Sequence, residues 1–238
     1  MENPTDDLPE QNNDKAIPDG IENNQQKNED ENHERKNSDD EYADPESRIH
    51  YTPDFLVYRS MRLKSNGKFT FQFTIDEDHL FITKMKGKHP TIPIPIGNGA
   101  ELPKSTDTEY VLIPSKDFHQ FSMTQNGEEV FSCELEPIDP NRKSPKKITA
   151  HWIPKNGQQY HLKSRMPELQ PDGEYVLDFQ ERFAKPSIKN AIFADVETDQ
   201  TEIMLRRLDE WEMNCEARPE IPPILVFALL LSINICPF

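Results

Sequence analysis

The chain has 238 residues, a formal net charge of −16 and 34% hydrophobic residues. This length suits one substantial domain, or one domain with a tail. The charge is uneven, because residues 1–50 carry 16 acidic and 5 basic side chains, a net of −11. The acidic balance therefore says little about the partners of the remaining residues.

The cysteines are Cys133, Cys215 and Cys236, and they are too few and too far apart to indicate a disulfide framework or a zinc site. The N-terminus is polar and acidic, which is not typical of a signal peptide. These features predict an intracellular protein, and we expect neither a metal site nor a cofactor.

Residues 1–50 consist mainly of Asn, Gln, Asp, Glu and Lys, with almost no apolar side chains. Such a segment cannot bury enough surface to offset the entropy lost on ordering. We therefore expect a disordered acidic tail at 1–50 and a folded domain at 51–238. The tail would act either as a solvated spacer or as a partner-binding segment.

The domain reads as short strands separated by turns. Residues 69–75 alternate Phe or Ile with Thr and Gln, which is the period of a half-buried strand. The Asn-Gly pairs at 66–67 and 126–127 indicate tight hairpin turns. Residues 91–96 alternate Ile with Pro, so we expect an edge strand or an extended loop there. The other expected strands are 55–63, 80–85, 110–113, 118–123, 130–135, 148–153, 159–162, 174–179, 188–196 and 202–208.

The last apolar run, Ile224–Ile235, has ten apolar positions out of twelve and no charge. As a helix it would be about 18 Å long, whereas a bilayer core is about 30 Å thick. A short helix without a polar stripe belongs inside a protein. We therefore expect a core helix that begins near Pro222 and Pro223. A tilted or tail-anchoring membrane segment is the alternative.

About eleven expected strands and one helix that is apolar on every side fit together. Closed strand barrels can enclose a central helix, and the helix would supply the apolar surface that the strands need. The sequence therefore predicts an all-β closed barrel around a central C-terminal helix.

Four parts of the sequence, in order, resemble the tubby-like protein family. A basic loop enters a strand at Lys143–Thr149, and Ile153-Pro154 follows. An aromatic strand at Glu174–Phe179 leads to Ala184–Asn190, which is similar to the Ser-Val-Lys-Asn step of that family. The closing segment Pro223–Ser232 is similar to the terminal helix of the family.

The resemblance covers about residues 55–238 and implies a barrel of about twelve strands threaded by its C-terminal helix. It implies binding of phosphatidylinositol 4,5-bisphosphate headgroups and a role as a membrane-tethered adaptor, with delivery of membrane proteins to cilia as one task. We expect a monomer at the cytoplasmic side of the plasma or ciliary membrane, with the nucleus as a further location. Protein cargo or trafficking machinery would be its partners, and a nucleic-acid partner is not expected.

The candidate phosphoinositide-binding residues are Lys84, Lys86, Lys88 and Lys116. The first three are two residues apart, so a continuing strand would project them to one face as a phosphate cradle. The resemblance places Lys116 near another basic ligand of the family. The alternative for the first three is a solvated strand end.

Four further basic residues form a secondary basic patch in the sequence, which would be drawn to an anionic leaflet unless it is a simple exposed loop. They are Arg142, Lys143, Lys146 and Lys147.

The sequence gives little support for catalysis, because its histidines lack metal-ligand spacing and its cysteines lack a nearby histidine. We therefore expect a protein that is not an enzyme. The alternative to a lipid-binding adaptor is a protein-interaction or transcription-related factor that uses the barrel as a scaffold.

Overall fold

A computed structural model describes residues 54–238. The expected disordered tail at 1–50 lies outside the described residues.

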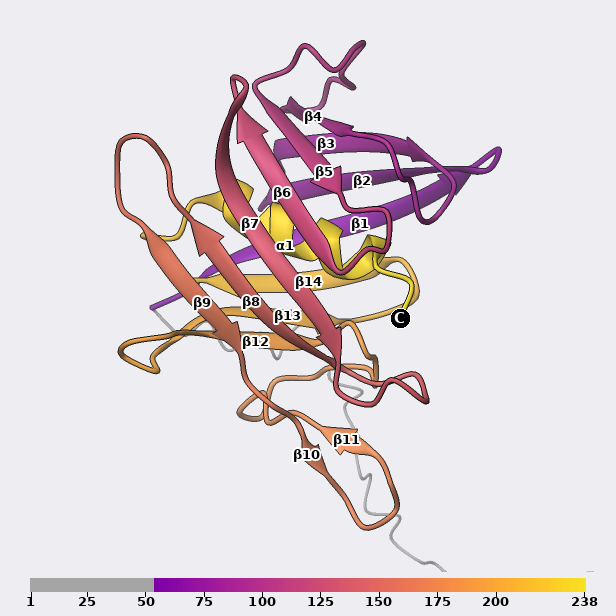
Figure 1. Cartoon of the computed structure of the whole chain (residues 1–238), viewed down its shortest axis with the longest axis vertical. Helices are drawn as coiled ribbons and strands as arrows, with labels where there is room; N and C mark the ends of the chain where they lie inside the picture. The colour runs from indigo at the N-terminus through magenta and orange to yellow at the C-terminus, as the bar shows by residue number, and fades with distance from the viewer. Residues whose placement is uncertain (1–53) are drawn as a thin grey trace, which may run out of the picture. The chain divides into compact units, whose positions relative to one another are not determined.

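Twelve antiparallel strands close into a barrel, in the order β1-β14-β13-β12-β9-β8-β7-β6-β5-β4-β3-β2 (Figure 1). This confirms the predicted fold. The strands are β1 Leu56–Ser65, β2 Lys68–Ile75, β3 Asp78–Lys86, β4 Ile94–Asn98, β5 Tyr110–Pro114, β6 Gln120–Gln125, β7 Glu128–Pro137, β8 Lys146–Trp152, β9 Tyr160–Ser164, β12 Ala191–Asp195, β13 Thr201–Arg207 and β14 Glu212–Ala217.

The helix α1, Pro223–Ile235, lies inside the barrel, as predicted (Figure 1). Every residue from Ile224 to Ile235 is buried. Phe227 stacks on Phe73 of β2, with ring centroids 5.2 Å apart, and on Phe81 of β3, at 6.0 Å. Aromatic pairs in this range add to the stabilisation from burial alone. Within residues 54–238, no helix is both long and apolar enough to cross a bilayer.

The two Asn-Gly hairpin turns are confirmed. Asn66 and Gly67 have φ angles of 49° and 70°, and Asn126 and Gly127 have 52° and 85°. Positive φ at both central residues matches the twist of the flanking strands, and Asn and Gly adopt it at the lowest cost. These turns set the registers of β1 with β2 and of β6 with β7.

The prediction of an edge strand or loop at 91–96 was wrong for its second half. Strand β4 begins at Ile94 and pairs with both β3 and β5. The barrel accepts Pro95 because the pairing of β4 with β3 stops at Gly97. Beyond that point the hydroxyl of Thr83 donates to the carbonyl oxygen of Pro95 at 2.7 Å, replacing a ladder bond.

The segment 174–179 was also assigned wrongly as a long strand. Only Tyr175–Val176 (β11) forms a strand, and it pairs with Glu168–Leu169 (β10) as a small hairpin outside the barrel (Figure 1). The strand that closes the barrel is β14, which was not predicted. Its inward residues Met213, Cys215 and Ala217 are a weak apolar signal, and Glu and Asn occupy the positions between them.

Candidate functional site

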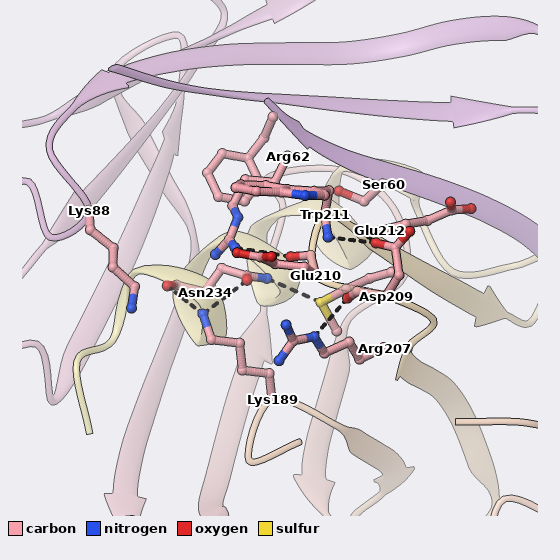
Figure 2. Close-up of a pocket in the computed structure, with 12 residues that line it drawn as sticks. Ser60, Arg62, Lys88, Lys189, Arg207, Asp209, Glu210, Trp211, Glu212 and Asn234 are labelled. Carbon is pink, nitrogen blue, oxygen red and sulfur yellow. Dashed lines mark hydrogen bonds between the residues drawn. The ribbon is translucent and has the colours of Figure 1, made fainter. Parts of the chain in front are cut away.

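A cavity of about 350 Å³ opens at the end of the barrel where α1 ends (Figure 2). Strands β1 and β2, the residues after β3, the segment before β12 and the β13–β14 turn all contribute to it. We call it the mouth pocket. It is lined by Ser60, Arg62, Phe71, Lys88, Lys189, Arg207, Asp209, Glu210, Trp211, Glu212, Met213 and Asn234.

Four cationic side chains meet at the mouth pocket. Figure 2 shows Arg62, Lys88 and Lys189 reaching toward the same space from different parts of the chain, with Arg207 beside Lys189. Like charges repel strongly at short range where water is partly excluded. The convergence of these cations therefore costs folding free energy, and a bound anionic ligand would lower that cost.

Lys189 forms the floor of the mouth pocket. Its ammonium donates hydrogen bonds to the backbone oxygen of Asn234 at 2.9 Å and to Oδ1 of Asn234 at 3.0 Å, so it caps the negative end of α1. Burial, with repulsion from Arg62, Lys88 and other cations, lowers the pKa of Lys189 to about 7. A bound anion would attract the ammonium, favour its charged form and so raise this pKa again.

Arg62 is fixed between two aromatic rings. Its guanidinium carbon lies 5.9 Å from the ring centroid of Phe69 and 5.2 Å from that of Trp211. Its Nη2 also donates to the backbone oxygen of Glu210 at 3.0 Å. Burial, with repulsion from Arg207, lowers the pKa of Arg62. The result is a planar donor held in one orientation at the pocket wall.

The turn Asp209–Glu212 forms an acidic wall. Asp209 Oδ1 accepts hydrogen bonds from the backbone NH groups of Trp211 at 2.6 Å and Glu212 at 2.7 Å. Glu212 forms an ion pair with Arg59 at 2.6 Å. In the described part of the chain, the carboxylate of Glu210 has neither an ion pair nor a hydrogen bond.

Beside the pocket, exposed lysines cluster where β1 and β2 meet and where β3 ends. Lys68, Lys84 and Lys86 lie on the outer face of the sheet, and Lys64, which pairs with Phe69, lies on the inner face at the strand end. We call these four residues the lysine rim. Lys68 lies directly opposite Lys86 in the β2–β3 pairing, an arrangement of like charges that destabilises a sheet. None of the four has an ion pair with a residue in 54–238. The rim lysines therefore have no carboxylate partner in the described part of the chain.

The candidate lysines of β3 do not all share one face. Lys84 and Lys86 are both exposed and alternate with the buried Thr83 and Met85. Strand β3 ends at Lys86, and Gly87 turns the chain with a φ of 75°. Lys88 therefore leaves the outer face and lines the mouth pocket.

Lys116 is not brought into this site. It is exposed in the turn between β5 and β6, which is held by hydrogen bonds from Ser115 Oγ and the His119 backbone NH to Asp117 at 2.6 and 3.2 Å. It does not line the mouth pocket.

The secondary basic patch does not form one basic surface. Arg142 pairs with Asp139 at 3.0 Å, donates to the oxygen of Gly173 at 3.3 Å and lies over the ring of Tyr175. These contacts fasten the loop to the β10–β11 hairpin, so Arg142 has a structural role.

The other three residues of the patch separate from one another. Lys143 is exposed, and Lys147 lies 3.9 Å from a carboxylate oxygen of Glu136. Lys146 is only 5% exposed, which corrects the expectation of an exposed loop. It is the first residue of β8, and the strand alternation turns its side chain inward. Its ammonium has no hydrogen-bond partner among the described residues, and burial lowers its pKa.

The sequence reasoning missed Arg62, Lys189, Arg207 and the acidic turn. Arg62 lies more than a hundred positions before the others, and it meets them only because β14 closes the barrel against β1. Lys189 lies inside the segment that resembles the Ser-Val-Lys-Asn step, which was the one available signal.

No protein-family model matches the chain, and no curated protein matches it at a significant level. The closed barrel with its buried helix is established by the structure, whereas the resemblance to the tubby-like family stays a prediction.

Proposed function

We propose that the protein is a phosphoinositide-binding adaptor that docks reversibly on a cytoplasmic membrane leaflet and catalyses no reaction. The observation that carries the proposal is the convergence of Arg62, Lys88, Lys189 and Arg207 on one cavity beside the lysine rim.

The chemistry of a phosphorylated headgroup suits this arrangement. Phosphate groups carry close to two charges and several strong acceptor oxygens, so they need two or three converging donors. Arg62 and Arg207 can offer planar pairs of N–H donors, whereas Lys88 and Lys189 act as point charges. The lysine rim would add about 1 kcal/mol of attraction per residue near an anionic leaflet. Binding would also relieve the repulsion among the pocket cations.

The resemblance to tubby-like proteins supports the broader part of the proposal. In that setting the protein would act as a monomer at the plasma or ciliary membrane and help to localise membrane proteins. Phosphatidylinositol 4,5-bisphosphate is the lipid that the resemblance favours.

Vesicle flotation of the full-length protein tests the proposal. We expect flotation with vesicles that contain phosphatidylinositol 4,5-bisphosphate, and a strong loss in the Lys84/Lys86/Lys88→Ala triple variant. The Lys143→Ala variant is a control for the loss of a basic side chain elsewhere, since Lys143 is exposed but outside the site. Flotation that does not depend on the lipid, or that survives the triple substitution, would count against the proposal.

A second candidate is a protein-interaction or transcription-related factor. The segment between β9 and β12 exposes the apolar side chains of Met166, Leu169, Val176 and Phe183. The same segment carries exposed carboxylates at Glu168, Asp172, Glu174, Asp178 and Glu181.

Charge complementarity favours a basic, partly apolar protein segment as the partner of this surface. The wild type should then pull down such a basic partner, and the Leu169→Ser/Val176→Ser variant should not. This result, together with flotation that does not depend on lipid, would support this candidate over the first.

A further inference from the structure

The mouth pocket has two chemically different walls. One wall carries Lys88 and Lys189, and the other carries the turn Asp209–Glu212 with the indole of Trp211 (Figure 2). Arg207 lies next to this turn, where its Nε donates to the backbone oxygen of Asp209 at 2.7 Å. A pocket that only attracts phosphate would be weakened by carboxylates, because like charges repel. The acidic wall therefore requires a different explanation.

Two of its three carboxylates are used by the protein itself. Asp209 holds the turn through backbone NH groups, and Glu212 pairs with Arg59. The carboxylate of Glu210 differs, because no residue in 54–238 donates a hydrogen bond to it. It is exposed, it lines the pocket, and only its longer-range attraction acts on Arg62. Glu210 is thus the acceptor that remains open to a ligand.

We propose that Glu210 binds hydroxyl groups of a phosphorylated polyol, such as the inositol ring of a headgroup or of a free inositol phosphate. An ionised carboxylate only accepts hydrogen bonds, and ring hydroxyls are donors. Cations on the facing wall would hold the phosphates of the same ligand, and Trp211, which is 38% exposed, would contact the ring. The inference rests on the proposed function and adds the residue that selects the ligand.

A ligand ammonium could also pair with a carboxylate, as in phosphoethanolamine. Arg62 argues against this ligand, because its guanidinium already lies against the same turn, bonded to the Glu210 backbone oxygen at 3.0 Å. A second cation there would be repelled, whereas a neutral hydroxyl would not. The wall therefore favours a polyol phosphate.

Calorimetric titration of the full-length protein tests the role of Glu210, with inositol 1,4,5-trisphosphate, pyrophosphate and phosphoethanolamine as probes. We expect the wild type to prefer the inositol phosphate to pyrophosphate. Glu210→Ala should reduce this preference about tenfold, because it removes a charge-assisted hydrogen bond to a ring hydroxyl that pyrophosphate lacks.

Glu168→Ala is the matched control, since it removes the same charge from an exposed position in β10, outside the barrel. It should leave the preference unchanged. Tightest binding of phosphoethanolamine, or an unchanged preference in Glu210→Ala, would overturn the inference while leaving the proposed function in place.

Vesicles separate the two sources of the ligand. Tighter binding to vesicles with phosphatidylinositol 4,5-bisphosphate than to the free inositol phosphate would assign the site to a lipid headgroup, and equal affinities would assign it to the free compound. A wild type that binds none of these phosphate compounds would end both the proposed function and this inference.

Discussion

The end of β3 and the loop before β8 carry similar numbers of basic residues, but the fold uses them in different ways. In the loop, Arg142 is bound by Asp139 and Gly173, and Lys147 lies near Glu136. At the end of β3, Lys88 enters a pocket that already contains the cations Arg62, Lys189 and Arg207.

The difference shows why charge density in a sequence is a weak guide to a binding site. A basic residue that is paired with a carboxylate contributes to the stability of the protein and is less available to bind an anionic ligand. A group of cations that face one another destabilises the protein, and an anionic ligand removes that cost. Substitutions in the two regions should therefore have different effects on the binding of an anionic ligand.

The largest expected effect follows from removing two pocket cations. Lys88→Ala/Arg207→Ala should weaken flotation with phosphatidylinositol 4,5-bisphosphate vesicles about 100-fold, since it removes two charge-assisted contacts. Arg142→Ala/Lys147→Ala removes the same charge from the other region and should change binding less than about twofold. Equal losses of vesicle binding in the two double variants would show that the two regions do not differ in their role in binding.

This experiment needs a check on folding, because Arg207 Nε also donates to the backbone oxygen of Asp209 at 2.7 Å. Thermal melting of each variant provides it. Arg207→Lys keeps the charge and should recover part of the binding.

A substitution of Lys146 should stabilise the protein. Its buried ammonium lacks a hydrogen-bond partner in the described chain, so Lys146→Met should raise the free energy of unfolding by about 2 kcal/mol. Lys147→Met, at the exposed neighbouring position, should change it by less than about 0.5 kcal/mol. Urea unfolding measures both. A destabilised Lys146→Met would reveal that this ammonium is needed inside the barrel.

The pH dependence of the protein should report on Lys189, whose pKa falls from 10.5 to about 7 on folding. Between these values the unfolded chain keeps the proton and the folded chain does not. The free energy of unfolding should therefore rise with pH in this window, by at most about 1.4 kcal/mol per unit.

Headgroup binding should show the opposite trend, because the phosphate favours the protonated Lys189. Affinity should decrease as the pH rises from about 7 to 8, by at most about tenfold. Lys189→Met should flatten both profiles. Profiles that Lys189→Met leaves unchanged would assign the titration to another group.

The smallest expected effect belongs to the lysine rim. Lys84→Ala or Lys86→Ala alone should weaken vesicle binding about fivefold at low salt, and less as salt screens the attraction. Lys143→Ala should have a smaller effect under the same conditions. A loss at Lys84 that does not depend on salt would indicate a direct contact with a phosphate instead.

Much of the fold could be predicted from local patterns. The alternation at 69–75, the two Asn-Gly turns and the apolar run of α1 each encode their own structure. Strand β14 could not be predicted in this way. Its outward residue Glu216 is buried and forms ion pairs with Arg182 and Arg206. A buried salt bridge hides the alternation on which strand prediction depends.

Only those residues of the candidate site whose position follows from the neighbouring sequence could be predicted. Lys88 was found because it follows a strand, whereas Lys189 and Glu210 take their positions from barrel closure. Lys146 was misplaced because its neighbours are charged, although the alternation of β8 determines its direction. Contacts between distant strands, not composition, decide which cations share a space.

Anion binding at the mouth pocket can be tested directly by hydrogen–deuterium exchange of the full-length protein, with and without phosphatidylinositol 4,5-bisphosphate vesicles. If the headgroup binds there, exchange should slow in residues 60–71, 86–89 and 207–213 and should not change in 139–147. Protection confined to 139–147 or to the β10–β11 hairpin, with none around the mouth pocket, would contradict it.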